Sequence, residues 1–325
     1  MTNPFAFIVG CPRSGTTLLQ RMVDAHPQIA IVPEIGWLAS RYEERKGLTP
    51  EGMVTSQFLS DLRSLGRYTP LPVSTRDIES VIASGSAVSY ANLITWLFDA
   101  QGKVKGKHFV GSKSVDHVRA LRTLHGLWPR AKLVHLIRDG RDVGLSAIHW
   151  RKAAKLANVF GTWKEAPVST AAVWWEWQVR LAREAGNSLG EKVYYEMRYE
   201  SLVRRPAETC QALCEFLGVP YDEAMLNFHR SRPKSDPDLD AKHAWLPPTP
   251  GLRDWNSQMP GPDVERFEAV AGKLLDELGY PRATRRPRAG SMEHAARIRR
   301  LFEGRPLPRA WTAAHNEVSR CRGVS

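Results

Sequence analysis

The chain has 325 residues, of which 42% are hydrophobic and 25% are charged, a composition typical of a globular protein and not of a disordered one. No apolar run approaches the roughly 18 residues that a membrane-spanning helix needs, the N-terminal residues lack the signals of a secretory leader, and the four cysteines form neither a disulfide framework nor a C-x-x-C metal pair. These features predict a cytoplasmic protein.

The net charge of +12 is unevenly distributed along the chain. Residues 281–325 contain eleven arginines and three glutamates, so this stretch carries +8 and residues 1–280 are nearly balanced. Residues 1–280 therefore lack the excess of positive charge that would indicate binding of nucleic acid. We expect one domain over residues 1–280, followed by a basic C-terminal extension over 281–325 that can touch anionic surfaces.

Apolar runs alternate with segments of helical periodicity. Strands are expected at residues 5–9, 29–32, 108–111, 132–137 and 192–195, and the main helices between and after them at 15–25, 115–127, 139–154, 170–185, 206–217 and 263–278. Such alternation implies right-handed crossovers and a sheet covered on both sides. The sequence therefore predicts an α/β fold, a P-loop NTPase-like central parallel sheet flanked by helices on both faces.

Two regions interrupt this alternation. Residues 35–107 are expected to form mostly helices and loops, with helical candidates at 51–65, 76–84 and 88–100. Residues 231–252 contain five prolines and are expected to form a long surface loop. In the basic extension, one further helix is expected near 291–303.

The first predicted strand runs directly into the sequence GCPRSGTT, residues 10–17, and a helix begins there. Glycines let the backbone curl so that several N–H groups point inward, and the helix N-terminus adds positive potential, so this arrangement favours binding of a phosphate group. An ordinary tight turn is the alternative. The residues expected to bind the phosphate are Pro12, Arg13, Ser14, Gly15, Thr16 and Thr17.

This loop differs from that of an ATPase. Thr16 occupies the position of the lysine that reaches the β- and γ-phosphates. Arg138 follows the strand at 132–137, where a carboxylate that holds a metal ion is usual, and Asp139 comes one residue late. An arginine in the loop without these two groups suits a transfer reaction on an anion with no metal.

A second anion site is expected after the strand at 132–137. Arg138 lies at the end of that strand and Ser146 two turns into the next helix, so both side chains can bind one phosphate. Two phosphate sites at one sheet edge suggest a nucleotide with phosphate groups at both ends.

The two segments resemble the cofactor motifs of the PAPS-dependent sulfotransferases. The sequence is most similar to the branch that contains the tyrosylprotein sulfotransferases, through RSGTT at 13–17, DAHP at 24–27, Glu34, Lys113 and WPRAK at 128–132. The resemblance covers roughly residues 5–281 and includes later elements at 195–202 and 216–220, Trp255 and 260–261. Members of that branch are Golgi-anchored, whereas no anchor is recognised here, so the acceptor need not be a tyrosine of a secreted protein.

The resemblance implies PAPS as the sulfuryl donor, PAP as the product, and no metal. It implies Glu34 as the general base, Lys113 as a cation at the sulfuryl group, and the loop as the cradle for the 5′-phosphate. Arg13 is the expected cation for the leaving group. Glu34 follows a strand at the carboxyl edge of the sheet, where ligands bind in such folds; the alternative is a glutamate that only stabilises a helix N-terminus.

The resemblance suggests two further cofactor contacts. Tyr199 either approaches the adenine or ribose or packs in the core, and Arg253 reaches the 3′-phosphate from the proline-rich region.

Two alternatives to a sulfotransferase remain at this level, a P-loop kinase or NTPase and a PAP-binding module without catalysis. The acceptor is expected to be a small-molecule hydroxyl. Aromatic residues in the segments that should surround it favour an aromatic or lipophilic alcohol, and these are Trp37, Tyr42, Phe58, Trp96, Phe160, Trp163 and Trp245. The sequence does not predict an oligomeric state.

Overall fold

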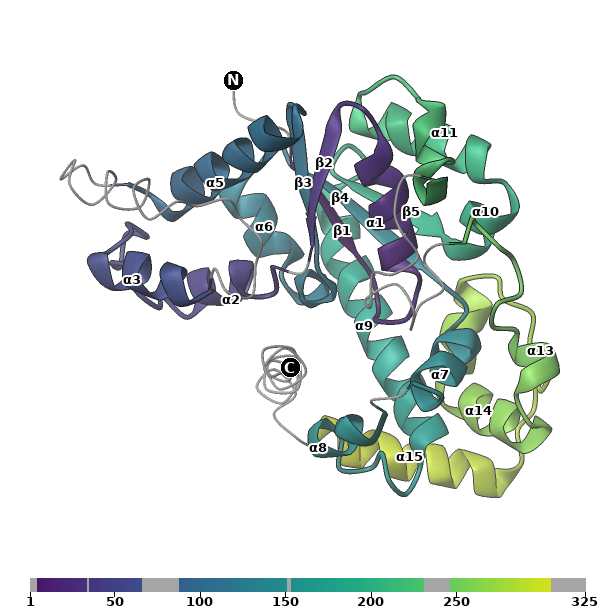
Figure 1. Cartoon of the computed structure of the whole chain (residues 1–325). Helices are drawn as coiled ribbons and strands as arrows, with labels where there is room; N and C mark the ends of the chain where they lie inside the picture. Colours follow the sequence, from purple (N-terminus) through teal and green to yellow (C-terminus); the bar gives the residue numbers. More distant parts are fainter. Residues whose placement is uncertain (1–4, 34, 66–87, 151–152, 231–245, 305–325) are drawn as a thin grey trace. The chain divides into compact units, whose positions relative to one another are not determined.

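The computed structural model describes residues 5–33, 35–65, 88–150, 153–230 and 246–304 (Figure 1). Its packing divides the chain into two compact units. Unit 1 consists of Met1–Gly10, Gly15–Leu136 and Ala182–Pro250, and unit 2 consists of Cys11–Ser14, Ile137–Leu181 and Gly251–Ser325.

The sheet has five strands in the order β2-β3-β1-β4-β5. Their bounds are β1 Ala6–Val9, β2 Ile29–Pro33, β3 Phe109–Lys113, β4 Lys132–Ile137 and β5 Tyr194–Arg198. The pairs β1–β3, β1–β4 and β2–β3 are parallel. This confirms the predicted parallel sheet, although β5 begins two residues later than the sequence pattern suggests.

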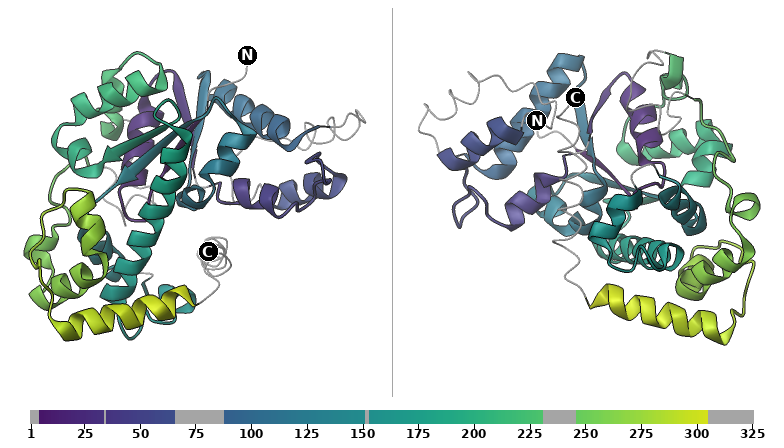
Figure 2. Two further views of the ribbon diagram at one scale, coloured as in Figure 1. Left: turned by 180° about the vertical axis from the view of Figure 1, so that it is seen from behind. Right: turned by 60° about the horizontal axis from the view of Figure 1, so that its bottom comes forward.

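The strand β1 is buried on both faces because its alternate side chains enter different apolar cores. Phe5, Phe7 and Val9 pack in one core. That core also includes side chains of α5 (Tyr90–Lys105) and α6 (Leu121–Leu127). Ala6 and Ile8 pack in the other, which is completed by α1 Thr16–Ala25, α10 Tyr199–Arg204 and α11 Pro206–Leu217. Figures 1 and 2 show these helices on both sides of the strands, as the sequence predicts.

The remaining elements of unit 1 follow the sequence pattern with one exception. The described helices and turns here are α2 Trp37–Glu43, α3 Ser56–Leu65, η3 Glu223–Met225 and η4 Phe228–Arg230. The helix candidate at 76–84 lies outside the described residues. The single helix expected over 115–127 is wrong, because the 3-10 helix η1 (Val115–Arg119) precedes α6 and Ala120 between them is not helical (φ −128°, ψ 23°).

Unit 2 is built from helices. They are α7 Gly140–Ile148, η2 Ala153–Lys155, α8 Leu156–Val159, α9 Pro167–Leu189 up to Leu181, α13 Trp255–Gln258, α14 Gly261–Glu277 and α15 Ala289–Glu303. Aromatic pairs join them: Trp175 packs on Phe267 with ring centroids 6.0 Å apart, and Phe160 stacks on Phe302 at 5.4 Å. The helix expected over 139–154 ends at Ile148.

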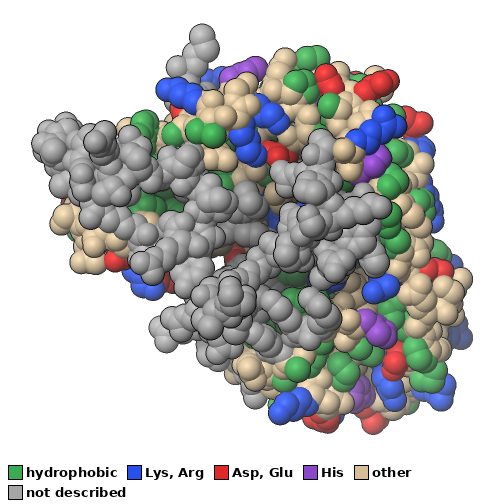
Figure 3. Space-filling view, viewed as in Figure 1, with side chains coloured by type: hydrophobic (Ala, Val, Ile, Leu, Met, Phe, Trp, Pro, Cys, Tyr) green, Lys and Arg blue, Asp and Glu red, His purple; other side chains and the backbone are tan. Residues whose placement is uncertain are grey.

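The described part of the basic extension, residues 281–304, pairs its arginines with carboxylates of unit 2. Arg297 contacts Glu165, and Arg299 contacts Glu176. Arg288 lies 3.1 Å from a carboxylate oxygen of Glu265. On the face that Figure 3 shows, Lys and Arg side chains likewise lie among acidic and apolar ones. Part of the positive charge that the sequence concentrates here is therefore balanced within the unit.

Among the described helices, none combines the length and the apolar character needed to cross a membrane.

A buried histidine lies inside β4. His135 is fully buried, and its Nδ1 lies 2.6 Å from the hydroxyl of Tyr194, which donates to Glu196 at 3.0 Å. Nε2 has no hydrogen-bond partner among the described residues. Burial, together with the nearby Arg183 and Arg198, lowers the pKa of His135 to about 3. The imidazole is therefore neutral in the folded protein.

We predict that this histidine makes the folded protein less stable as the pH is lowered. Its pKa is lower when folded than the ordinary 6.5, so below about pH 6.5 only the unfolded chain gains the proton. The free energy of unfolding should fall by roughly 1 kcal/mol between about pH 7 and about pH 5.5, measured by urea denaturation. The variant His135→Asn, which keeps a donor toward Tyr194, should lose that part of the pH dependence; an unchanged slope would contradict the assignment.

Candidate active site

The loop after β1 depends on two glycines of unit 1. A Cβ at Gly10 would lie 2.6 Å from the carbonyl oxygen of Leu136, so only glycine lets β1 end this close to β4. Gly15 precedes α1 in the left-handed conformation, with φ 92°, which glycine adopts without strain. Helix α1 then begins at Thr16, and its first backbone N–H groups are the anion-binding groups that the sequence predicts.

Tyr199 supports this turn. It is the first residue of α10, is buried in the same core as α1, and would lie 2.5 Å from a Cβ at Gly15. Its ring therefore packs directly against the loop glycine. The contact agrees with the packing role that the sequence left open, and a contact with adenine or ribose stays a prediction.

The first half of the loop, Cys11–Ser14, belongs to unit 2. Arg13 has φ 76°, an unusual conformation for a residue with a side chain, which costs roughly 1–2 kcal/mol and is typical of functional sites. The backbone N–H of Ser14 donates to Cys11 at 3.1 Å. The Ser14 hydroxyl is buried and has no hydrogen-bond partner among the described residues. A buried hydroxyl of this kind suits a loop that binds a polar ligand.

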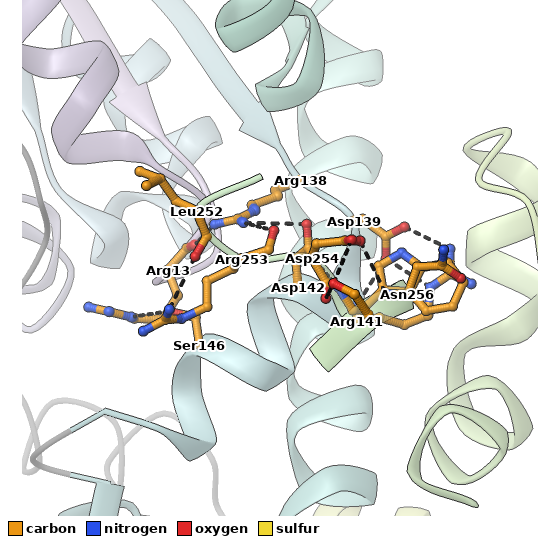
Figure 4. A network of polar contacts seen from close by, with 12 residues as sticks. Arg13, Arg138, Asp139, Arg141, Asp142, Ser146, Leu252, Arg253, Asp254 and Asn256 are labelled. Atoms are coloured by element: carbon orange, nitrogen blue, oxygen red, sulfur yellow. Dashed lines mark hydrogen bonds and ion pairs between the residues drawn. The ribbon is translucent and has the colours of Figure 1, made fainter. Parts of the chain in front are cut away.

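The side chain of Arg13 lies among residues that the sequence assigned to the second phosphate (Figure 4). Its Nε donates to the Ser146 hydroxyl at 3.1 Å, and Arg138 donates to its carbonyl oxygen at 3.4 Å. Arg13 also lies over the ring of Trp150, 5.8 Å from the centroid. Burial, and then the positive charges of Arg138 and Arg253, lower the pKa of Arg13 to about 10.

Arg253 completes this group, although it lies far from the loop in sequence. Nη2 of the buried Arg138 donates to the carbonyl oxygen of Arg253 at 3.3 Å. The guanidinium of Arg253 donates to the carbonyl oxygen of Leu252 at 3.1 Å. Unit 2 therefore brings together four of the predicted site residues, which we call the arginine cluster: Arg13, Arg138, Ser146 and Arg253.

The residues around the start of α7 fix Arg138. Asp139 caps this helix by accepting from the backbone N–H of Arg141 at 2.9 Å. A Cβ at Gly140 would lie 2.4 Å from the ring of Trp175, whose Nε1 donates to the carbonyl oxygen of Arg138 at 3.2 Å. The glycine is thus required for close packing of Trp175, and Trp175 holds the backbone of Arg138.

Three charged or aromatic residues near the cluster received no role from the sequence. The buried guanidinium of Arg141 donates to Asp139 and to Glu268, each at 2.7 Å, and lies 3.5 Å from the ring centroid of Trp255. Asp142 pairs with Arg138 at 3.3 Å. The spacing of four residues between Arg138 and Asp142 could have indicated that pair, whereas nothing local indicates the contact with Trp255.

In unit 1, Lys113 is the last residue of β3. It is buried, and its backbone is in register with Ile8 of β1 and Pro33 of β2. Lys113 is therefore not a surface lysine. Glu34, the expected base, lies outside the described residues, but it directly follows Pro33 in the chain.

No group of three His, Cys, Asp or Glu side chains that could hold a metal ion is found within the ranges that the structure describes.

Comparison with known proteins gives a consistent result. A model of the sulfotransferase family matches residues 4–223, more than half of the chain. The chain is 26% identical over 288 residues to protein-tyrosine sulfotransferase A of Caenorhabditis elegans, covering 86% of this chain and 68% of the relative. It is 25% identical over 319 residues to human protein-tyrosine sulfotransferase 1, covering 93% of this chain and 76% of that protein.

Solved structures show the same fold. The sulfotransferase domain of the Synechococcus PCC 7002 olefin synthase superposes with a TM-score of 0.57 at 23% identity, covering 86% of this chain and 97% of that domain. The sulfotransferase domain from the curacin biosynthetic pathway superposes with a TM-score of 0.51 at 19% identity, covering 91% of this chain and 97% of that domain. The predicted fold class is confirmed by these likenesses.

We predict that Gly15→Ala destabilises the protein by roughly 1–3 kcal/mol, because alanine is strained at a positive φ and its Cβ would collide with Tyr199. Thermal unfolding measures the effect. Gly126→Ala is the matched control, since Gly126 lies in α6 with nothing within 4 Å of an added Cβ. That variant should keep or slightly raise the stability. Equal effects at both glycines would contradict the steric argument.

Proposed function

Because the chain belongs to the sulfotransferase family, we propose that it moves a sulfuryl group from PAPS to an acceptor hydroxyl by in-line displacement. The family match confirms the predicted class of enzyme. The donor, the base and the acceptor of this particular chain are the subject of the proposal, and the arginine cluster is the observation that carries it.

The arginine cluster favours a ligand with a doubly charged phosphate. Arg13, Arg138 and Arg253 are close enough for the charges of the other two to lower the pKa of Arg13, so the three guanidinium groups repel one another. A phosphate dianion relieves this repulsion, and guanidinium groups bind phosphate oxygens with paired hydrogen bonds. We assign the 3′-phosphate of PAPS to this cluster, with Ser146 as a further hydroxyl donor.

The start of α1 is the proposed site for the 5′-phosphosulfate. Gly15 leaves room for a close approach of the backbone, and the N–H groups at Thr16 and Thr17 point along the positive end of the helix. No acidic residue occurs in the first turn of α1, so no carboxylate of that turn competes with the anion.

The role of Arg13 at the leaving group stays a prediction. Its backbone lies in the phosphate loop, but its Nε contacts Ser146, a residue that we assign to the 3′-phosphate. Charge neutralisation at the 5′-phosphate therefore requires the guanidinium to exchange Ser146 for a phosphate oxygen.

The proposed reaction needs a base and a cation near the sulfuryl group. As the acceptor oxygen forms its bond to sulfur, the bond from sulfur to the 5′-phosphate oxygen breaks and the hydroxyl proton passes to Glu34. Lys113 stabilises the negative charge that develops on the bridging oxygen, and PAP leaves. The burial of Lys113 supports this role, because a charge in a site of low dielectric acts more strongly than one in water.

A phenolic hydroxyl is the acceptor that we propose. The relatives from Caenorhabditis elegans and human are protein-tyrosine sulfotransferases by name, and the aromatic residues expected around the acceptor favour an aromatic or lipophilic alcohol. Tyrosine side chains and small phenols share the same nucleophile. The cytoplasmic location expected from the sequence stays a prediction.

The proposal is tested by transfer of labelled sulfate from PAPS to three acceptors: a tyrosine-containing peptide, 4-nitrophenol and an aliphatic alcohol. Label on the peptide or the phenol supports a phenolic acceptor, and label on the alcohol alone contradicts it. ATP turnover that requires magnesium, without any sulfate transfer, would favour the kinase alternative. Binding of PAP without any sulfate transfer would favour the non-catalytic module.

In the same assay, Glu34→Ala and Glu34→Gln should lower kcat by about 10²–10⁴-fold, because the acceptor loses its base. Binding of PAP should persist in both variants. The exposed Glu51 offers a control, since Glu51→Ala should turn over at the wild-type rate. Wild-type turnover in the Glu34 variants would remove this residue from the mechanism.

Arg138→Ala should weaken binding of PAP much more than binding of 5′-AMP, which lacks the 3′-phosphate. We expect at least about a tenfold loss for PAP, since hydrogen bonds to charged groups are lost, and isothermal titration calorimetry measures it. Arg122→Ala, at an exposed arginine that pairs with Glu184, should bind both nucleotides normally. Equal losses for PAP and 5′-AMP would show that the 3′-phosphate binds elsewhere.

A further inference from the structure

The segment Leu252–Trp255, which carries Arg253, makes three contacts with Arg138 and the first turn of α7 within unit 2; Figure 4 shows Arg253 beside Arg138. Arg138 donates to the carbonyl oxygen of Arg253 at 3.3 Å. The backbone N–H of Trp255 donates to Oδ1 of Asp142 at 2.8 Å. The guanidinium of Arg141 lies 3.5 Å from the ring centroid of Trp255.

Asp142 contacts both this segment and Arg138. Its Oδ1 accepts from Trp255, and its Oδ2 accepts from Nη2 of Arg138 at 3.3 Å. The same Nη2 donates to the carbonyl oxygen of Arg253. One carboxylate of α7, the helix that carries Ser146, therefore contacts both Arg138 and the segment that carries Arg253.

The need for such a link follows from the local structure. Helix α13, which begins at Trp255, has only four residues and cannot be stable by itself. Its apolar contact with this part of unit 2 is small: Trp255 packs on a cluster of Leu145, Met259 and Val264. The positive charge of Arg253 moreover opposes that of Arg13, so a polar contact that holds the backbone beside Arg253 helps to keep the two groups together.

We propose that Asp142 is a positioning residue for the 3′-phosphate. It acts by fixing the backbone of Leu252–Trp255 so that Arg253 and Arg138 bind the same phosphate group. This inference rests on the proposed function, because it concerns the same nucleotide. The alternative is that the Asp142 carboxylate competes with the phosphate for Arg138 and so lowers the affinity for phosphate.

Two substitutions separate these roles. Asp142→Asn keeps an acceptor oxygen for the N–H of Trp255 and removes the charge, whereas Asp142→Ala removes both. If Asp142 acts as an anchor, calorimetry should show PAP affinity within about threefold of wild type for Asp142→Asn and a loss of about tenfold for Asp142→Ala. Affinity for 5′-AMP should stay nearly constant in both.

A second pair tests the same hydrogen bond from the other side. Trp255→Ala removes the ring but keeps the backbone N–H, and Trp255→Pro removes both. Proline is tolerated at the first position of a helix, and Asp254 before it is already extended (φ −137°, ψ 104°). The proline variant should bind PAP about tenfold more weakly than the alanine variant, with equal affinity for 5′-AMP. This pair remains informative if Asp142→Ala does not fold.

Specific outcomes overturn the inference. Tighter PAP binding in both Asp142 variants would identify the carboxylate as a competitor. Equal losses in Asp142→Asn and Asp142→Ala, equal losses for PAP and 5′-AMP, or identical PAP binding by the two Trp255 variants would each exclude the anchor. If the wild-type protein itself does not distinguish PAP from 5′-AMP, the proposed 3′-phosphate site fails, and this inference fails with it.

Discussion

The repulsion among three neighbouring guanidinium groups is the constraint on which the arginine cluster depends. Arg13, Arg138 and Arg253 come from three distant stretches of the chain; burial, and then the charges of Arg138 and Arg253, lower the pKa of Arg13. Such an arrangement persists only where the surrounding structure holds each backbone in place. A bound phosphate dianion offsets the repulsion, which is why we assign the cluster to nucleotide binding.

The surrounding structure meets this demand around Arg138. Trp175 fixes the carbonyl group of Arg138, and the absence of a side chain at Gly140 allows Trp175 to approach. Arg141 lies between the carboxylates of Asp139 and Glu268, so the first turn of α7 is tied to α14. Because Glu268 also accepts from the backbone at residues 283 and 284, the start of the basic extension supports the same part of unit 2.

Unit 1 positions its own candidate groups by a different physical route. These groups are positioned by the ends of strands and by glycines, whereas ion pairs contribute to positioning in unit 2. Gly10 permits close approach of two strands, Gly15 turns the chain into α1 against Tyr199, and β3 delivers Lys113 to the end of the sheet in a buried position. A backbone N–H cradle and a buried cation suit a substrate whose charge increases on the leaving oxygen as the reaction proceeds.

The sequence by itself determined the parallel sheet, the glycine-rich loop after β1 and the identity of Arg138 and Ser146 as candidates, because these depend on local periodicity and on residue spacing within short segments. Arg253 became a candidate only through the family resemblance. The tertiary structure decided how they combine. It placed the Arg13 side chain on Ser146, packed Tyr199 on Gly15 and joined Asp142 to Trp255, which is 113 residues away. It also broke the helix expected over 115–127, where the buried His117 packs on Phe7 and contacts the carbonyl oxygen of Ile35. Contacts between distant segments depend on packing of the whole unit, and no local pattern encodes them.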